Sequence, residues 1–235
     1  MSARAMAPPR TQRGRLLVLA PHPDDETLGA GALIRQSADE GWYAGTVYLT
    51  DGGASHPGRV EGARARLVQT RRREARCALS RLIGRSVPLP LLLGWRDAEP
   101  AERGSARWRA TLRRLHGYCR RHRVGRIAVS AITDAHCDHV AAARLARDVA
   151  ALSGNAIGVF EYRIWSQRPE NARWLWRSKP LAPGIRRRAL AAHRSQCSAA
   201  LGPGFRLPFT IGWTPRADLL QGRDHVGINA VEQHQ

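Results

Sequence analysis

The most constraining feature of the sequence is an abrupt change from apolar to polar residues near its start. The aliphatic run from Leu16 to Ala20 leads directly into Pro21-His22-Pro23-Asp24-Asp25-Glu26. A short aliphatic run that ends in histidine, proline and acids is typical of a buried strand that delivers polar groups to its carboxyl end, where open α/β sheets keep their sites. The chain is therefore expected to place polar chemistry at one edge of a sheet.

The consecutive acids in this segment predict a positive partner. Adjacent carboxylates repel one another, and burying them is costly unless a cation or several hydrogen-bond donors lie nearby. His22 and Asp25 offer a nitrogen and an oxygen ligand three residues apart, which suits zinc. The alternative is a solvated acidic turn in which Asp24, Asp25 and Glu26 begin a helix.

A second polar cluster follows another apolar run far along the chain. Residues 126–131 are mostly apolar and lead into Asp134-Ala135-His136-Cys137-Asp138-His139. A doubly wound sheet can bring two such strand ends together, so one histidine of this cluster would complete a three-ligand site with a position left for water. Two matching clusters favour a metal site over two unrelated turns.

The alternation of apolar patterns predicts a single α/β domain. Strands are expected at 16–20, 44–50, 87–93, 124–131 and 156–160, and helices at 27–38, 59–82, 105–121, 139–152 and 185–201. This order predicts a Rossmann-like, doubly wound, mostly parallel sheet with helices on both faces. Prolines within the 87–93 run suggest that this strand lies at a sheet edge.

The ends of the chain differ from its middle in composition. Residues 1–14 are rich in Arg, Pro and Ala without an apolar stretch and are predicted to form a disordered basic tail. Residues 15–201 are predicted to form the domain, and residues 202–235 a Gly- and Pro-rich extension of it. No run approaches the ~18 apolar residues that span a bilayer.

The two polar clusters resemble the motifs of a known family, the PIG-L or LmbE-like zinc-dependent deacetylases of N-acetylglucosaminyl compounds. The segment from His22 to Glu26 is similar to the family's His-Pro-Asp-Asp-Glu motif, and the segment from His136 to His139 to its His-x-Asp-His motif. Cys137 stands where the family usually has proline. Weaker similarities extend over residues 15–200 at Thr50-Asp51-Gly52, Arg71-x-x-Glu74-Ala75, Asp97 and Ser195-Gln196.

The resemblance implies a zinc-dependent hydrolase that removes the N-acetyl group from an N-acetylglucosamine-type sugar conjugate. Asp24 would be the general base, a cationic His136 would stabilise the oxyanion or protonate the leaving amine, and Asp138 would orient His136. The full expected set comprises zinc ligands His22, Asp25 and His139, catalytic residues Asp24, His136 and Asp138, and sugar contacts Arg71 and Asp97.

The net charge of +19 leaves a second class of function open. Lys179 is the single lysine among 38 basic residues, and the arginines spread from Arg4 to Arg223 without a dominant block. This distribution favours a compositional origin, with weak association with anionic surfaces, and no dedicated nucleic-acid motif is present. The alternative is a basic polyanion-binding protein, for nucleic acid or anionic lipid, in which the acidic clusters are structural.

The spacing of the cysteines indicates the redox environment of the protein. The four cysteines have no Cys-x-x-Cys spacing. This pattern is typical of reduced thiols, so we expect a cytoplasmic protein.

Overall fold

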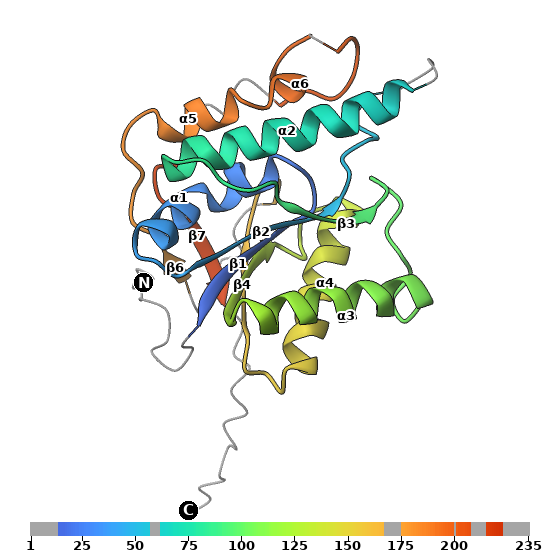
Figure 1. Cartoon of the computed structure of the whole chain (residues 1–235), viewed down its shortest axis with the longest axis vertical. Helices are drawn as coiled ribbons and strands as arrows, with labels where there is room; N and C mark the ends of the chain where they lie inside the picture. Colours follow the sequence, from blue (N-terminus) through green and yellow to red (C-terminus); the bar gives the residue numbers. More distant parts are fainter. Residues whose placement is uncertain (1–13, 57–61, 167–174, 200, 208–214, 223–235) are drawn as a thin grey trace, which may run out of the picture.

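A seven-stranded sheet with the strand order β3-β2-β1-β4-β5-β7-β6 organises the computed structural model (Figure 1). The structure describes residues 14–56, 62–166, 175–199, 201–207 and 215–222. Five strands run parallel: β1 (Arg15–Ala20), β2 (Tyr43–Thr50), β3 (Leu91–Trp95), β4 (Val124–Ser130) and β5 (Gly158–Tyr162). Strand β7 (Leu219–Gly222) is antiparallel to β5, and β6 (Leu175–Arg177) is antiparallel to β7. The prediction of an α/β fold with a mostly parallel sheet is confirmed.

Helices cover both faces of this sheet. One face carries α1 (Asp25–Asp39), α2 (Ala63–Ile83) and α5 (Ile185–Leu190), and the other carries α3 (Ala106–Arg121) and α4 (Cys137–Leu152). Successive residues of a strand point to opposite faces, so Leu17 and Leu19 of β1 join the core under α3 and α4. Leu16 and Val18 join the core under α1 and α2. Burial of β1 on both faces explains its unbroken aliphatic run.

The sheet departs from the sequence prediction mainly toward the end of the chain. The helix expected at 185–201 is instead two short helices, α5 and α6 (Arg194–Cys197). Strand β3 starts at Leu91 rather than at residue 87, because the prolines of this run cannot donate to a strand ladder, and it lies at the sheet edge as expected. No strand was predicted at β6 or β7.

The C-terminal strand anchors the helix that starts at the first polar cluster. Asp218, just before β7, is buried and accepts the Leu33 N–H of α1 at 2.7 Å. The same carboxylate pairs with Arg186 of α5, whose Nη1 donates to the Thr27 carbonyl of α1 at 2.7 Å. Helix α1 is thereby tied to two segments that follow it by more than 150 residues.

Some predicted segments lie outside the described residues. These are residues 1–13 of the basic tail, residues 59–61 at the expected start of the second helix, and residues 208–214 and 223–235 of the extension. The boundaries 1–14, 15–201 and 202–235 stay predictions. Within the described ranges, every helix is too short or too polar to cross a membrane.

Candidate metal centre and catalytic pocket

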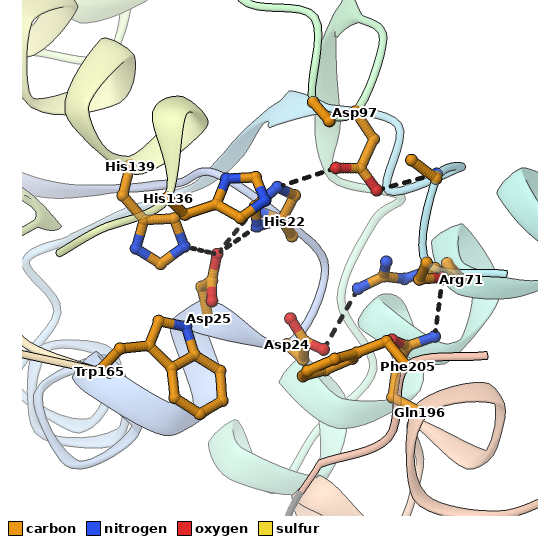
Figure 2. A pocket seen from close by; sticks show the side chains of 13 residues that line it. His22, Asp24, Asp25, Arg71, Asp97, His136, His139, Trp165, Gln196 and Phe205 are labelled. Atoms are coloured by element: carbon orange, nitrogen blue, oxygen red, sulfur yellow. Dashed lines mark hydrogen bonds and ion pairs between the residues drawn. The ribbon is translucent and has the colours of Figure 1, made fainter.

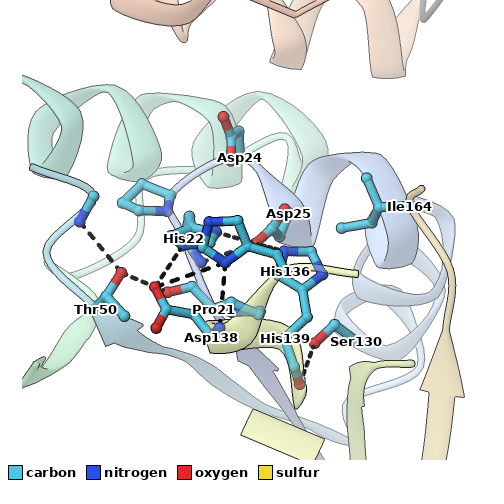
Figure 3. Close-up of polar contacts among 12 residues, drawn as sticks. Pro21, His22, Asp24, Asp25, Thr50, Ser130, His136, Asp138, His139 and Ile164 are labelled. Carbon is cyan, nitrogen blue, oxygen red and sulfur yellow. Dashed lines mark hydrogen bonds and ion pairs between the residues drawn. The ribbon is translucent and has the colours of Figure 1, made fainter. Parts of the chain in front are cut away.

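The two polar clusters meet at the carboxyl ends of β1 and β4, which are adjacent strands. The strand order reverses between them, because the chain passes from β1 outward to β2 and β3 and then returns to β4 on the other side. Such a switch point leaves a crevice at the strand ends. The loop after β1 is tied to the end of β2 by the Thr50 hydroxyl, which donates to the Pro21 carbonyl at 3.0 Å (Figure 3).

The backbone of the first cluster is held in an uncommon conformation at Asp24. Its φ of 138° is rare for a residue with a side chain. The Asp24 N–H donates to the buried Glu26 carboxylate at 3.0 Å, and the Asp24 carbonyl accepts the N–H groups of Thr27 and Leu28. In the described structure the Asp24 carboxylate does not cap α1. This backbone frees the carboxylate to face the pocket.

One carboxylate oxygen of Asp25 lies between two imidazoles. Asp25 Oδ2 is 3.1 Å from His22 Nδ1 and 3.3 Å from His139 Nε2 (Figure 2). All three residues are buried, with exposed fractions of 2% for Asp25, 9% for His22 and 1% for His139. Helix α4 carries His139 in its first turn, and the Ser130 hydroxyl at the end of β4 donates to the His139 carbonyl.

The second nitrogen of each imidazole faces another carboxylate. His22 Nε2 is 3.0 Å from Asp138 Oδ2 and 3.2 Å from Asp97 Oδ1. His139 Nδ1 is 3.0 Å from Asp134 Oδ2. Carboxylates placed behind histidines in this way orient imidazoles that bind metals and make them more basic. No role was expected for Asp134 from the sequence, although it stands in the second cluster.

These donors fit a metal ion. His22, Asp25 and His139 offer ligand atoms that all lie within 4.8 Å of one another. Tetrahedral zinc with bonds of about 2.1 Å separates its ligand atoms by roughly 3.4 Å, close to the observed distances at Asp25. A second group of possible ligand atoms lies equally close together; it consists of His22, Asp97, His136 and Asp138. The first group is the better fit because each of its histidines keeps a carboxylate on its remaining nitrogen.

The carboxylates of the cluster favour positive charge on its two buried histidines. Burial would raise the pKa of Asp25, but His139 and His22 hold it well below its usual range. Burial would lower the pKa of His139, but Asp25 and Asp134 raise it to about 9. The pKa of His22 is likewise raised, against burial, by Asp138, Asp25 and Asp97. Carboxylates that draw protons onto these imidazoles would equally stabilise a bound metal cation.

Asp24 is paired with a buried arginine. Arg71 of α2 is 3% exposed, and its Nη2 lies 3.2 Å from Asp24 Oδ2. The guanidinium also donates to the carbonyls of Pro23 at 2.7 Å and Gly52 at 2.8 Å, so it ties two loops to the helix. Burial raises the pKa of Asp24 to about 6, although Arg71 opposes the shift. A carboxyl with this pKa can accept and return a proton near neutral pH.

The structure departs from the expectation for His136 and Asp138. The Asp138 carboxylate lies 3.9 Å from His136 Nδ1, too far for a hydrogen bond, and instead faces His22 and accepts the Ala98 N–H at 2.8 Å. His136 Nδ1 accepts the Asp138 backbone N–H at 3.2 Å, so the ring of a neutral His136 carries its proton on Nε2. Burial and the nearby His22 lower the pKa of His136, so the cationic form expected from the sequence is disfavoured.

A pocket of about 270 Å³ opens over these groups (Figure 2). It brings together seven of the eight residues expected from the sequence, and the eighth, Asp138, is fully buried behind His22. Asp97 lines the pocket while its Oδ2 accepts the Ala54 N–H at 2.9 Å. The lining is completed by Ala54, Ser55, Ala98, Trp165, Gln196 and Phe205, of which Ala98 and Phe205 were not singled out from the sequence.

Comparison with known proteins places this arrangement in a family. The family model described as PIG-L: GlcNAc-PI de-N-acetylase matches residues 17–150, a span that contains both polar clusters. The chain belongs to this family. The likeness of the motifs is therefore confirmed as family membership.

The individual proteins similar to this PIG-L chain either match a small part of it or share little sequence identity with it. The 2'-N-acetylparomamine deacetylase of Streptomyces fradiae is 35% identical over 89 residues, which are 38% of this chain and 31% of the relative. The match thus spans about a third of the relative's length. The N,N'-diacetylchitobiose deacetylase of Pyrococcus horikoshii superposes with a TM-score of 0.63 at 17% identity, over 89% of this chain and 83% of the other.

The same fold also serves a different reaction. The 4-carboxy-2-hydroxymuconate hydratase of Pseudomonas putida superposes with a TM-score of 0.59 at 18% identity, over 92% of this chain and 99% of the other. At these identities the structural matches show the fold alone. The chemistry of this PIG-L chain must be argued from its own site residues.

Proposed function

We propose that this chain is a zinc-dependent hydrolase that removes the N-acetyl group from an N-acetylglucosamine-type sugar conjugate. The observation that carries the proposal is the His22-Asp25-His139 donor set at the base of a pocket that also holds Asp24. The S. fradiae relative is named for removal of an N-acetyl group from an amino sugar, which supports the same chemistry.

The metal would be held by His22, Asp25 and His139, with Asp97, Asp134 and Asp138 behind the imidazoles. A zinc ion there would supply Lewis acidity, polarising the acetamide carbonyl and making a water easier to deprotonate. A mixed set of nitrogen and oxygen ligands favours zinc over magnesium or calcium, which prefer oxygen ligands alone.

Asp24 would act as the general base. Its carboxylate lines the pocket next to Asp25 and has a pKa of about 6, so near neutral pH it is largely ionised. It would take one proton from the water that adds to the carbonyl carbon. When the carbon–nitrogen bond breaks, that proton can pass to the nitrogen, leaving acetate and a free amine.

His136 would stabilise the oxygen of the acetamide as it gains negative charge. Its Nδ1 is occupied by the Asp138 N–H, so the neutral ring presents Nε2–H as a hydrogen-bond donor. Arg71 and Asp97 are proposed as sugar contacts because both line the pocket, and both also position other groups there: Arg71 holds Asp24, and Asp97 holds His22.

The proposal is tested by measuring zinc content and amine release together. Purified protein should contain about one zinc per chain and release amine from N-acetylglucosamine derivatives, with activity lost to a chelator and restored by zinc. Asp24→Asn should keep its zinc while kcat falls by roughly 10²–10⁴-fold, the usual contribution of a general base. His139→Ala should lose zinc.

Matched controls lie outside the pocket. Asp39→Asn removes an exposed carboxylate paired with Arg35, and His116→Ala removes a histidine of α3; both should keep zinc and activity. If Asp24→Asn loses zinc and activity together, Asp24 is a ligand and the assignment is wrong. A protein without zinc that stays inactive after zinc addition would contradict the proposed function.

A further inference from the structure

A buried ion pair lies between α1 and α6. His193 directly precedes α6, Glu26 lies in the first turn of α1, and both residues are 0% exposed. His193 Nε2 lies 3.5 Å from Glu26 Oε1. Neither residue lines the pocket, so neither can touch a substrate bound there. Any effect of this pair on the chemistry must therefore pass through another residue.

Glu26 holds the backbone of the proposed general base. Its Oε2 accepts the Asp24 N–H at 3.0 Å, and its Oε1 accepts the Thr27 hydroxyl at 2.6 Å. The Asp24 backbone has the uncommon φ of 138°, and a conformation of this kind persists only where the surrounding structure fixes it. The Glu26 carboxylate is thus part of what directs the Asp24 side chain into the pocket.

The Glu26 carboxylate carries a buried charge that its hydrogen bonds do not balance. Its two donors, the Asp24 N–H and the Thr27 hydroxyl, are uncharged. A carboxylate removed from water is stable only beside an opposite charge or with several hydrogen-bond donors. His193 places an imidazole on the Oε1 side of this carboxylate, so a charged ring there would balance it.

The surroundings of His193 favour its charged form. Both ring nitrogens are buried and make no hydrogen bond within the described residues. A neutral ring would therefore bury two polar nitrogens with nothing gained, whereas a charged ring is attracted to the Glu26 carboxylate. Burial would lower the pKa of His193, but Glu26 and Asp24 raise it above its ordinary value, although Arg71 opposes the increase.

Helix α2 supports Asp24 from two sides. Arg71 contacts the Asp24 carboxylate directly, with Nη2 3.2 Å from Oδ2 (Figure 2). One turn further along α2, Glu74 accepts the N–H of Ser195 at 2.9 Å and its hydroxyl at 2.5 Å. Ser195 lies in α6, two residues after His193, so these bonds fix the segment that carries the imidazole. Arg71 thus orients the side chain of Asp24 directly, and Glu74 fixes the segment that reaches its backbone.

We propose that His193 is a positioning residue for the general base. Its charged ring pairs with the Glu26 carboxylate and fixes it where it accepts the Asp24 N–H, so that the Asp24 carboxylate faces the pocket. This rests on the proposed deacetylase function, because it assigns His193 to the same reaction. Without the charge at His193, the Asp24 backbone should relax and turnover should fall, while the zinc ligands, which are held by other carboxylates and imidazoles, stay in place.

Kinetics of two single variants and their double variant test the positioning role. His193→Gln and Glu26→Gln should each lower kcat about tenfold or more, with KM changed less than twofold and about one zinc per chain retained. Because the two residues act through one contact, the double variant should be no slower than the slower single variant. An unchanged kcat in His193→Gln, or losses that multiply in the double variant, would overturn the proposal.

Asp148→Asn is the matched control for lost stability. Asp148 pairs with Arg103 at 2.5 Å and accepts the Trp108 Nε1–H at 2.9 Å, on the face of the sheet opposite α1. Its substitution should lower the unfolding temperature while kcat stays within twofold of the wild type. A kcat that falls in His193→Gln only as far as it falls in Asp148→Asn would overturn the positioning role.

The charge of His193 can be measured in the wild-type protein. In nitrogen NMR spectra of the zinc-loaded protein near neutral pH, both ring nitrogens of His193 should be protonated, and a ring with one bare nitrogen would overturn the proposal. If the wild type releases no amine, but the ring is charged and crystals of His193→Gln show the Asp24 N–H detached from Glu26, the deacetylase function fails and the control of Asp24 by His193 stands. If the wild type releases amine and His193→Gln keeps the wild-type kcat, only the positioning role fails.

Discussion

At the scale of single residues, the site depends on histidines that use both ring nitrogens. His22 and His139 each turn one nitrogen toward Asp25 and the other toward a supporting carboxylate. The proximity of His22 and Asp25 could be predicted from the sequence, because these residues are neighbours in one loop. The contact of His22 with Asp138 could not, because 116 residues separate them and only the packing of β1 beside β4 brings them together.

Asp134 supplies a prediction at this scale. Asp134→Asn should weaken zinc binding by about 10–100-fold, because the amide supports the His139 imidazole less well than a carboxylate does. The affinity can be measured by competition with a chromophoric chelator. Asp39→Asn is the matched control and should bind zinc like the wild type. An Asp134→Asn affinity equal to that of the wild type would show that Asp134 only caps the neighbouring backbone, whose Ser166 N–H it accepts at 2.9 Å.

At the scale of elements, α2 holds in place two of the loops that border the pocket. Arg71 reaches from the middle of α2 to the loops after β1 and β2 and leaves little room at Gly52. The strands β1, β2 and β4 could be predicted because each is a continuous apolar run that ends in polar residues. The break between α5 and α6 and the strands β6 and β7 could not, because short elements depend on tertiary partners such as the Arg186–Asp218 pair.

The close approach of Arg71 predicts the effect of a side chain at Gly52. Gly52 has a φ of +65°, and a Cβ there would lie 2.6 Å from Arg71 Nη1. Gly52→Ala should displace the guanidinium from Asp24 and lower kcat by about tenfold or more, as small displacements of catalytic groups do. Stopped assays at saturating substrate measure this loss.

Gly41→Ala is the matched control for this prediction. Gly41 also has a positive φ, +77°, so both substitutions cost about 1–2 kcal/mol of backbone strain. A Cβ at Gly41 would have no atom within 4 Å, so turnover should be unchanged. Equal losses of kcat in the two variants would show that strain alone, and not the contact with Arg71, limits activity.

At the scale of the whole molecule, the net charge of +19 is separate from the pocket chemistry. The buried carboxylates of the site are paired with histidines or with Arg71. The arginines that make the chain basic are distributed along its whole sequence. We therefore propose that the charge gives weak and nonspecific association with anionic surfaces. Such binding depends on released counterions and weakens steeply with salt.

This proposal predicts a difference in salt sensitivity. Retention on immobilised heparin should fall sharply between about 50 and 200 mM salt, whereas turnover of a neutral amino-sugar substrate should change less than twofold over the same range. Retention is measured by elution and turnover by amine release. Tight heparin binding that survives the higher salt, together with absent turnover, would favour the polyanion-binding alternative.

The proposed chemistry depends on a metal ion held by His22, Asp25 and His139. Crystals of the zinc-loaded protein, measured on both sides of the zinc absorption edge, locate the ion directly. One anomalous peak is expected, within about 2.3 Å of a nitrogen of each histidine and of an Asp25 oxygen. A peak among His22, Asp97, His136 and Asp138 instead, or no peak in protein that is catalytically active, would contradict it.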